Sequence, residues 1–96
     1  MPNYVVLYRY TDQGAKHAKE TVKRARENRA ANEKRGFKIH QLFWTQGRYD
    51  LVAIVEAPSE QAMMSGLVNV MGAGNVRSET LRAFSEAEME AITAKA

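Results

Sequence analysis

The apolar positions of the first third of the chain change from a strand pattern to a helix pattern. Residues 4–10 form a β-branched and aromatic run that is typical of a strand. Residues 11–14 interrupt that run and offer caps for a helix. From Ala15 to about Arg35 nearly all residues are good helix formers, and Gly36 is placed to end the helix. The pattern therefore predicts a strand followed by one long helix.

The apolar stripe of this predicted helix is thin. Ala15, Ala18, Val22 and Ala25 recur at helical spacing, but only Val22 has a large side chain. Such a stripe lets a helix approach a sheet closely while contributing little burial.

The middle of the chain predicts a β-hairpin. Two strand-like runs cover residues 37–46 and 49–57, and Gly47 and Arg48 join them. Glycine at the first central position suits a type II′ turn.

The register of this hairpin assigns its side chains to the two faces of the sheet. A two-residue loop pairs Gln46 with Tyr49 and Thr45 with Asp50, and opposed residues project to the same side. The side with the better core residues carries His40, Leu42, Trp44, Tyr49, Leu51, Ala53 and Val55. The other side carries a mixture of apolar and polar residues: Ile39, Gln41, Phe43, Thr45, Asp50, Val52, Ile54 and Glu56.

The last part of the chain predicts a helix, a strand and a short terminal helix. Residues 58–60 start the helix, which runs to about Met71 and carries three methionines that we interpret as adaptable core packing. Residues 76–84 form the fourth strand. Ser85 and Glu88 match the capping box that opens a terminal helix from about residue 85.

The resulting order is strand, helix, strand, strand, helix, strand. This βαββαβ order predicts an α+β, ferredoxin-like domain with a four-stranded antiparallel sheet and both helices on one face. The length of 96 residues suits one domain over residues 1–96. The second sheet face is then bare, and burying Phe43, Val52 and Ile54 would contribute about 1.5 to 3 kcal/mol per side chain. We therefore expect a homodimer or a higher homo-oligomer.

Composition excludes several classes of site. The chain has no cysteine, so it has no disulfide, thiol nucleophile or thiolate metal site. It has no apolar run of the roughly 18 residues that a membrane span requires, and it lacks the pattern of a secretion signal. We therefore expect a cytoplasmic protein with no membrane segment.

Charge is unevenly distributed along the chain. Residues 1–48 hold eleven of the fourteen Lys and Arg residues but only four of the eleven acids. The basic helix is interrupted by Glu20, Glu27 and Glu33, and no base-stacking aromatic residues lie among its basic residues. A solvated helix face explains the charge, and nucleic acid is not an expected partner.

Three separated blocks of sequence carry a family resemblance. They are Thr11-Asp12-Gln13-Gly14, then Gly47-Arg48-Tyr49-Asp50 with Val52-Ala53-Ile54 and Glu56-Ala57-Pro58 after it, and the segment from Gly74 to Phe84. With these blocks in this order, essentially the whole chain resembles the GYD-domain family, which is named for its Gly-x-Tyr-Asp signature. The resemblance implies a ferredoxin-like fold of the dimeric α/β-barrel type and a bacterial origin, and it implies no particular reaction. The first helix is more basic and poorer in large apolar residues than the resemblance leads one to expect.

Asp50 is the best candidate for a catalytic group. A carboxylate near Phe43 and Val52 would have its pKa raised by desolvation, which suits a general base or a polar anchor. Alternatively, Asp50 accepts hydrogen bonds from Thr45 or a turn amide and fixes the hairpin. The sequence leaves both interpretations open.

Each of the remaining polar residues has a structural explanation, and some also have a functional one. We interpret His40 as a histidine on the core side of the sheet. We interpret His17 as a solvated histidine on the polar helix. Arg77 and Glu79 project to one side of a strand and suit an ion pair, whereas Arg77 alone suits an anion anchor. No spacing of His, Asp and Glu matches a metal motif, although Asp50, Glu79 and His40 are able in principle to converge. We expect neither a metal nor a cofactor.

Two functional hypotheses follow. In the first, paired sheets form a binding or assembly module in which Tyr8, Thr45, Asp50 and Arg77 orient a small molecule. In the second, the protein is a cofactor-free enzyme of the monooxygenase or isomerase kind that acts in the cavity between the sheets. The second hypothesis rests on analogy between folds alone.

Overall fold

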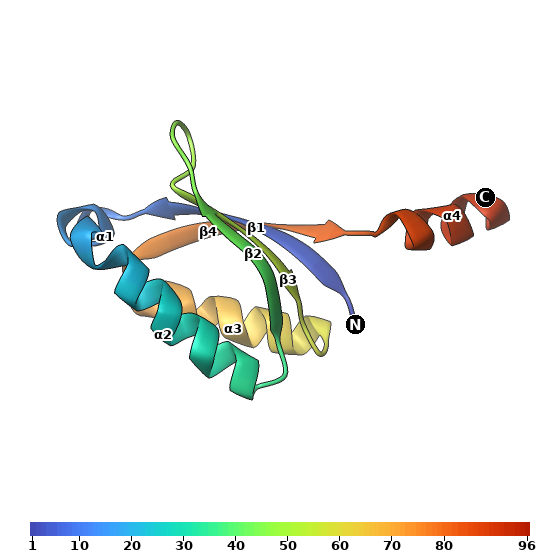
Figure 1. The fold of residues 1–96 in the computed structure, drawn as a ribbon, viewed down its shortest axis with the longest axis horizontal. Helices are drawn as coiled ribbons and strands as arrows, with labels where there is room; N and C mark the ends of the chain where they lie inside the picture. Colours follow the sequence, from blue (N-terminus) through green and yellow to red (C-terminus); the bar gives the residue numbers. More distant parts are fainter.

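Four strands form one antiparallel sheet in a computed structural model that describes residues 1–96. The strands are β1 (Asn3–Tyr10), β2 (Lys38–Trp44), β3 (Leu51–Glu56) and β4 (Val76–Ala83), in the spatial order β2-β3-β1-β4. Helices α2 (Thr21–Lys34) and α3 (Glu60–Gly72) lie on the same side of the sheet (Figure 1). The predicted α+β, ferredoxin-like fold is confirmed.

The first predicted helix is not continuous, which corrects the prediction of one helix from Ala15 to Arg35. The segment consists of α1 (Asp12–Lys16), a 3₁₀ turn η1 (Ala18–Glu20) and then α2. The Thr11 amide donates to the Asn75 carbonyl over 3.1 Å, which holds the start of α1 against the start of β4. The chain therefore has to turn before α2 runs back along the sheet.

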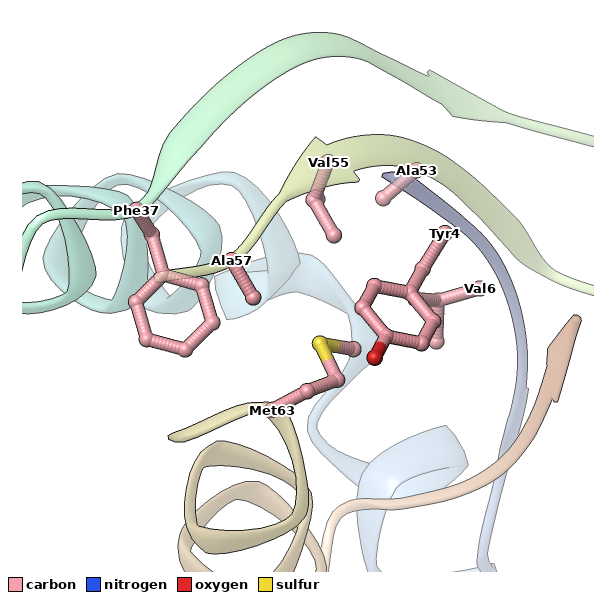
Figure 2. Packing of buried hydrophobic residues seen from close by; sticks show 7 residues of the cluster. All are labelled: Tyr4, Val6, Phe37, Ala53, Val55, Ala57 and Met63. Carbon is pink, nitrogen blue, oxygen red and sulfur yellow. The ribbon is translucent and has the colours of Figure 1, made fainter. Parts of the chain in front are cut away.

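The core lies between the two central strands and α3. Its buried residues are Tyr4, Val6, Phe37, Ala53, Val55, Ala57 and Met63. Figure 2 shows the Met63 side chain directed from α3 toward Tyr4. Ser59 caps α3, because its hydroxyl accepts the Ala62 amide over 3.0 Å. The predicted core role of the methionines holds for Met63, whereas Met64 on the outer side of α3 is 58% exposed.

The register of β2 against β3 is as predicted from Trp44 opposite Leu51 back to Gln41 opposite Ile54. It then shifts, so that Ile39 and not His40 lies opposite Val55. An extra residue in one strand turns the following side chains to the opposite face. The predicted core-side place of His40 is therefore wrong, and Ile39 packs against the core instead.

The hairpin between β2 and β3 protrudes from the sheet (Figure 1). Its last ladder bond runs from the Thr45 amide to the Asp50 carbonyl over 2.9 Å, and the predicted backbone pair of Gln46 with Tyr49 does not form. Gly47 has a φ of +100°, which agrees with the positive φ that a type II′ turn requires at its first central residue.

The C-terminal helix α4 (Glu86–Lys95) extends away from the sheet and its two helices (Figure 1). It opens with the predicted capping box, in which the Ser85 hydroxyl accepts the Glu88 amide and the Glu88 carboxylate accepts the Ser85 amide. These bonds, led by the one from the Ser85 backbone, hold the pKa of Glu88 below its usual value. None of the helices combines the length and apolar character that a bilayer crossing needs.

Candidate functional site

The first and third sequence blocks meet at one end of the sheet. The Thr11 hydroxyl donates to the Gly74 carbonyl over 2.5 Å, and the Gln13 side-chain amide donates to the Ala73 carbonyl over 3.1 Å. Gln13 also donates to the Asn75 side-chain oxygen over 3.0 Å. The loop before β4 is thus bound through its backbone carbonyls to the segment that leads into α1.

This junction requires glycine at position 14. A Cβ at this position would lie 1.9 Å from the Asn75 carbonyl oxygen, which is backbone and unable to rotate away. Only a residue without a side chain permits α1 to approach β4 this closely.

The signature residue Asp50 joins the same end of the sheet. Its amide donates to the Tyr8 carbonyl over 2.8 Å, and its carboxylate accepts the Tyr10 amide over 2.8 Å. The carboxylate thereby extends the pairing of β3 with β1 to the residue before the start of β3. Thr45 donates its hydroxyl to the Tyr49 carbonyl over 2.6 Å instead of to Asp50. The hydrogen bond seen at the Asp50 carboxylate is therefore to a neighbouring strand, and not to the turn.

Tyr49 reaches across the sheet to β4. Its hydroxyl donates to the carboxylate of Glu79, and this bond, with some desolvation, raises the pKa of Tyr49. Glu79 pairs with Leu7, whose strand neighbour Val6 is buried on the helix side, so Glu79 belongs to the opposite face. The predicted core-side place of Tyr49 is therefore wrong, because the irregular turn sends its side chain to the bare face.

Arg77 and Glu79 do not form the ion pair that their spacing predicted. His40 Nε2 and Glu56 Oε1 instead lie 2.8 Å apart, and the hydrogen bond between them is the main cause that lowers the pKa of Glu56. Asp50, Glu79 and His40 each have a different partner. No group of three His, Asp or Glu side chains lies where it would hold a metal ion.

One cavity lies on the helix side of the sheet, between α2, α3 and the central strands. It measures about 130 Å³, and its walls include Leu42, Val55, Met63 and Leu67. Of the four residues predicted to orient a ligand, Tyr8 lines this cavity, and Thr45, Asp50 and Arg77 do not. Burial raises the pKa of the Tyr8 hydroxyl. The two functional hypotheses predict a cavity between two sheets, whereas the thin apolar stripe of the first helix is the sequence feature that indicates space on the helix side.

These observations define a small ferredoxin-like protein with a bare sheet face, a helix-side cavity and three sequence blocks, of which the third is hydrogen-bonded to both the first and the second. The sequence profile of the GYD domain matches residues 4–93, so the chain belongs to the GYD domain family. The predicted family resemblance is confirmed.

One relative adds a functional description of a similar protein. Over 90 residues the chain is 28% identical to the glutamine synthetase and cystathionine beta-lyase binding protein of Thermus thermophilus. The aligned region covers 93% of this chain and 95% of the relative. No solved structure matches the chain.

Proposed function

We propose that this protein is a homodimeric binding module that pairs its bare sheet face with a second copy, as a dimeric α/β barrel, and binds other proteins. The bare-face patch carries the proposal. We define this patch by its six apolar residues: Val5, Leu7, Phe43, Val52, Ile54 and Leu81.

The patch is continuous across all four strands. In one row Phe43 lies opposite Val52, which lies opposite Leu7. In the next row Ile54 lies opposite Val5, which lies opposite Leu81. Cross-strand neighbours on one face touch each other, so the six side chains form a single apolar surface.

The patch has the layout of an interface with an apolar centre and a polar rim. Phe43 is 59% exposed and Leu81 is 47% exposed. Glu79 continues the row of Leu7 at one edge, and Gln41 continues the row of Ile54 at the other. Burial of each large apolar side chain against a second sheet would contribute about 1.5 to 3 kcal/mol.

Binding to other proteins is supported by the Thermus thermophilus relative, whose name states that it binds two enzymes. A catalytic role for Asp50 would require a second acid or base beside its carboxylate. The hydrogen bond seen there is to the Tyr10 amide, so the geometry supports a binding module better than an enzyme.

The dimer is tested by sedimentation equilibrium of matched variants. Phe43→Lys places a charge in the patch, whereas Val68→Lys places the same charge at a 57% exposed position on the outer side of α3. We expect the wild type and Val68→Lys to be dimers at micromolar concentration and Phe43→Lys to be a monomer. A monomeric wild type, or a dimeric Phe43→Lys variant, would contradict the proposed interface.

The protein-binding role is tested separately. Purified glutamine synthetase and cystathionine beta-lyase from the source organism of this chain are immobilised, and binding of the wild-type protein is measured by biolayer interferometry. We expect saturable binding to at least one of them with a Kd of about 10 μM or tighter. Absence of binding to both would refute a function like the one that the relative's name describes, and it would leave the dimer unaffected.

A further inference from the structure

The helix-side cavity has walls of opposite character. The sheet and α3 contribute apolar side chains such as Leu51, Val55 and Met63. Helix α2 instead contributes the polar residues Thr21, Asn28 and Asn32, with the small Ala25 between them at helical spacing. The side-chain amides of Asn28 and Asn32 form no hydrogen bond within the chain, so this wall offers free donors and acceptors.

The size of the cavity limits its occupant. A volume of about 130 Å³ is close to that of cavities of roughly 150 Å³ that admit benzene. Drug-sized ligands need roughly 300 to 1,000 Å³. The cavity therefore suits a body of one ring or a short branched chain.

The charge of the lining selects an anion. Arg24 and Arg29 line the cavity, and no Asp or Glu does. Arg24 donates one guanidinium bond to the His17 carbonyl over 2.7 Å. Arg29 forms no ion pair or hydrogen bond within the chain, so all of its donors are available.

Arg29 also marks the mouth of the cavity. A second hollow of about 180 Å³ lies between α2 and β2, and it shares Ala25, Arg29 and Leu42 with the cavity. An anionic group beside Arg29 is thus able to reach solvent while the apolar body stays between the helices and the sheet.

We propose that the helix-side cavity binds a small monocarboxylate with an apolar body of about one ring, whose carboxylate pairs with Arg29. The planar guanidinium holds a carboxylate through two parallel hydrogen bonds. The body packs against Met63, Leu67 and the apolar sheet residues. The Tyr8 hydroxyl forms no hydrogen bond within the chain and supplies a second polar contact inside the cavity.

The test is an NMR titration of the ¹⁵N-labelled full chain with phenylacetate and with its neutral isostere phenylacetamide. We expect phenylacetate to shift the amide signals of residues 21–32 and 63–70 in a saturable way, with a Kd of roughly 1 mM or tighter. Phenylacetamide should bind at least about tenfold more weakly, because it has no negative charge and only one acceptor oxygen for the guanidinium. Equal binding of the two probes would overturn the assignment of an anion site.

Two variants with matched controls locate the site. Arg29→Gln should weaken phenylacetate binding about tenfold, whereas Lys23→Gln removes the same charge from α2 outside both hollows and should leave binding unchanged. Ala25→Leu fills the cavity and should abolish binding, whereas Ala30→Leu adds the same side chain outside the lining and should not. Circular dichroism checks that each variant is folded.

Three results would refute the proposal. The first is the absence of saturable shifts up to about 10 mM phenylacetate. The second is an equal loss of binding in Arg29→Gln and Lys23→Gln, which would show a general effect of charge. The third is a set of shifts confined to the bare-face patch, which would place the probe on the opposite side of the sheet.

Discussion

Helices α2 and α3 cover the same face of the sheet, but they are held there in different ways. Helix α3 packs into the core through residues 62–67, with Met63 buried and Ala62 and Leu67 against the core. Helix α2 has no buried residue, and even Val22, its largest apolar residue, is 43% exposed.

Helix α2 is anchored at its two ends. At its start, the Thr21 hydroxyl oxygen accepts hydrogen bonds from the Tyr10 hydroxyl over 2.9 Å and the Trp44 indole over 3.0 Å. Beyond its end, Gly36 has a φ of +92° and turns the chain so that Phe37 enters the core. A polar helix is thus fixed over a sheet without packing into it, which leaves the cavity beneath its middle.

The largest effect should come from removing the anchor at the end of α2. Phe37→Ala deletes a ring that is only 8% exposed and should lower the free energy of unfolding by about 3 to 5 kcal/mol. Val22→Ala, in the middle of the same helix, should change it by less than about 1 kcal/mol. Urea denaturation followed by circular dichroism measures both. Comparable losses in the two variants would show that α2 packs along its length after all.

The junction that leads into α2 should give the next largest effect. Gly14→Ala forces a Cβ to within 1.9 Å of the Asn75 carbonyl oxygen, and relief of such a clash costs about 1 to 3 kcal/mol or more. Gly72→Ala is the matched control, because a Cβ at the end of α3 meets no atom within 4 Å. The control should unfold at the same denaturant concentration as the wild type or a higher one. A Gly14→Ala protein as stable as the wild type would show that the contact is not needed to position α1.

The sequence predicts the features that depend on local pattern, and it does not predict those that depend on long-range contacts. The order of strands and helices along the chain, the capping box at Ser85 and the apolar run of β3 were readable, because local pattern determines each of them. The bulge at His40 was not readable, since an extra residue in a strand leaves no mark in the alternation until its partner strand is known. The hydrogen bond from the Tyr10 amide to the Asp50 carboxylate joins residues forty positions apart, so no local pattern predicts it.

The cavity was the least predictable feature. The sequence showed that α2 has few large apolar residues, but not which side of the helix would face the sheet. The predicted stripe includes Val22 and Ala25, but of these two only Ala25 lines the cavity, together with Thr21, Asn28 and Asn32. The end anchors at Thr21 and Phe37 set the rotation of the helix, and they are long-range contacts.

A smaller effect is expected at the start of α2. Thr21→Val removes the oxygen that accepts from Tyr10 and Trp44, and the loss should be about 1 to 2 kcal/mol. Thr21→Ser keeps the oxygen and should retain most of the stability. Trp44 is the single tryptophan, so its fluorescence emission should move to longer wavelength in Thr21→Val and stay in place in Thr21→Ser. The same emission spectrum in both variants would mean that the indole bond does not hold the helix.

The smallest effect concerns the strands that connect the two helices. His40 lies in β2, which follows α2, and Glu56 ends β3, which precedes α3. Their hydrogen bond lowers the pKa of Glu56 from its ordinary value of 4.5. A carboxylate whose pKa is lower in the folded state stabilises that state above the unfolded pKa, and this contribution is lost as the pH falls through the folded pKa.

The stability of the wild type should therefore exceed that of Glu56→Gln near pH 6, and the difference should close toward about pH 3. His40→Ala should lose the same dependence on pH, because it removes the main cause of the lowered pKa. Thermal unfolding of the three proteins across this range measures the effect. A difference between wild type and Glu56→Gln that stays constant down to about pH 3 would mean that Glu56 acts through packing and not through its charge, and the link between the two helix-bearing strands would then not be electrostatic.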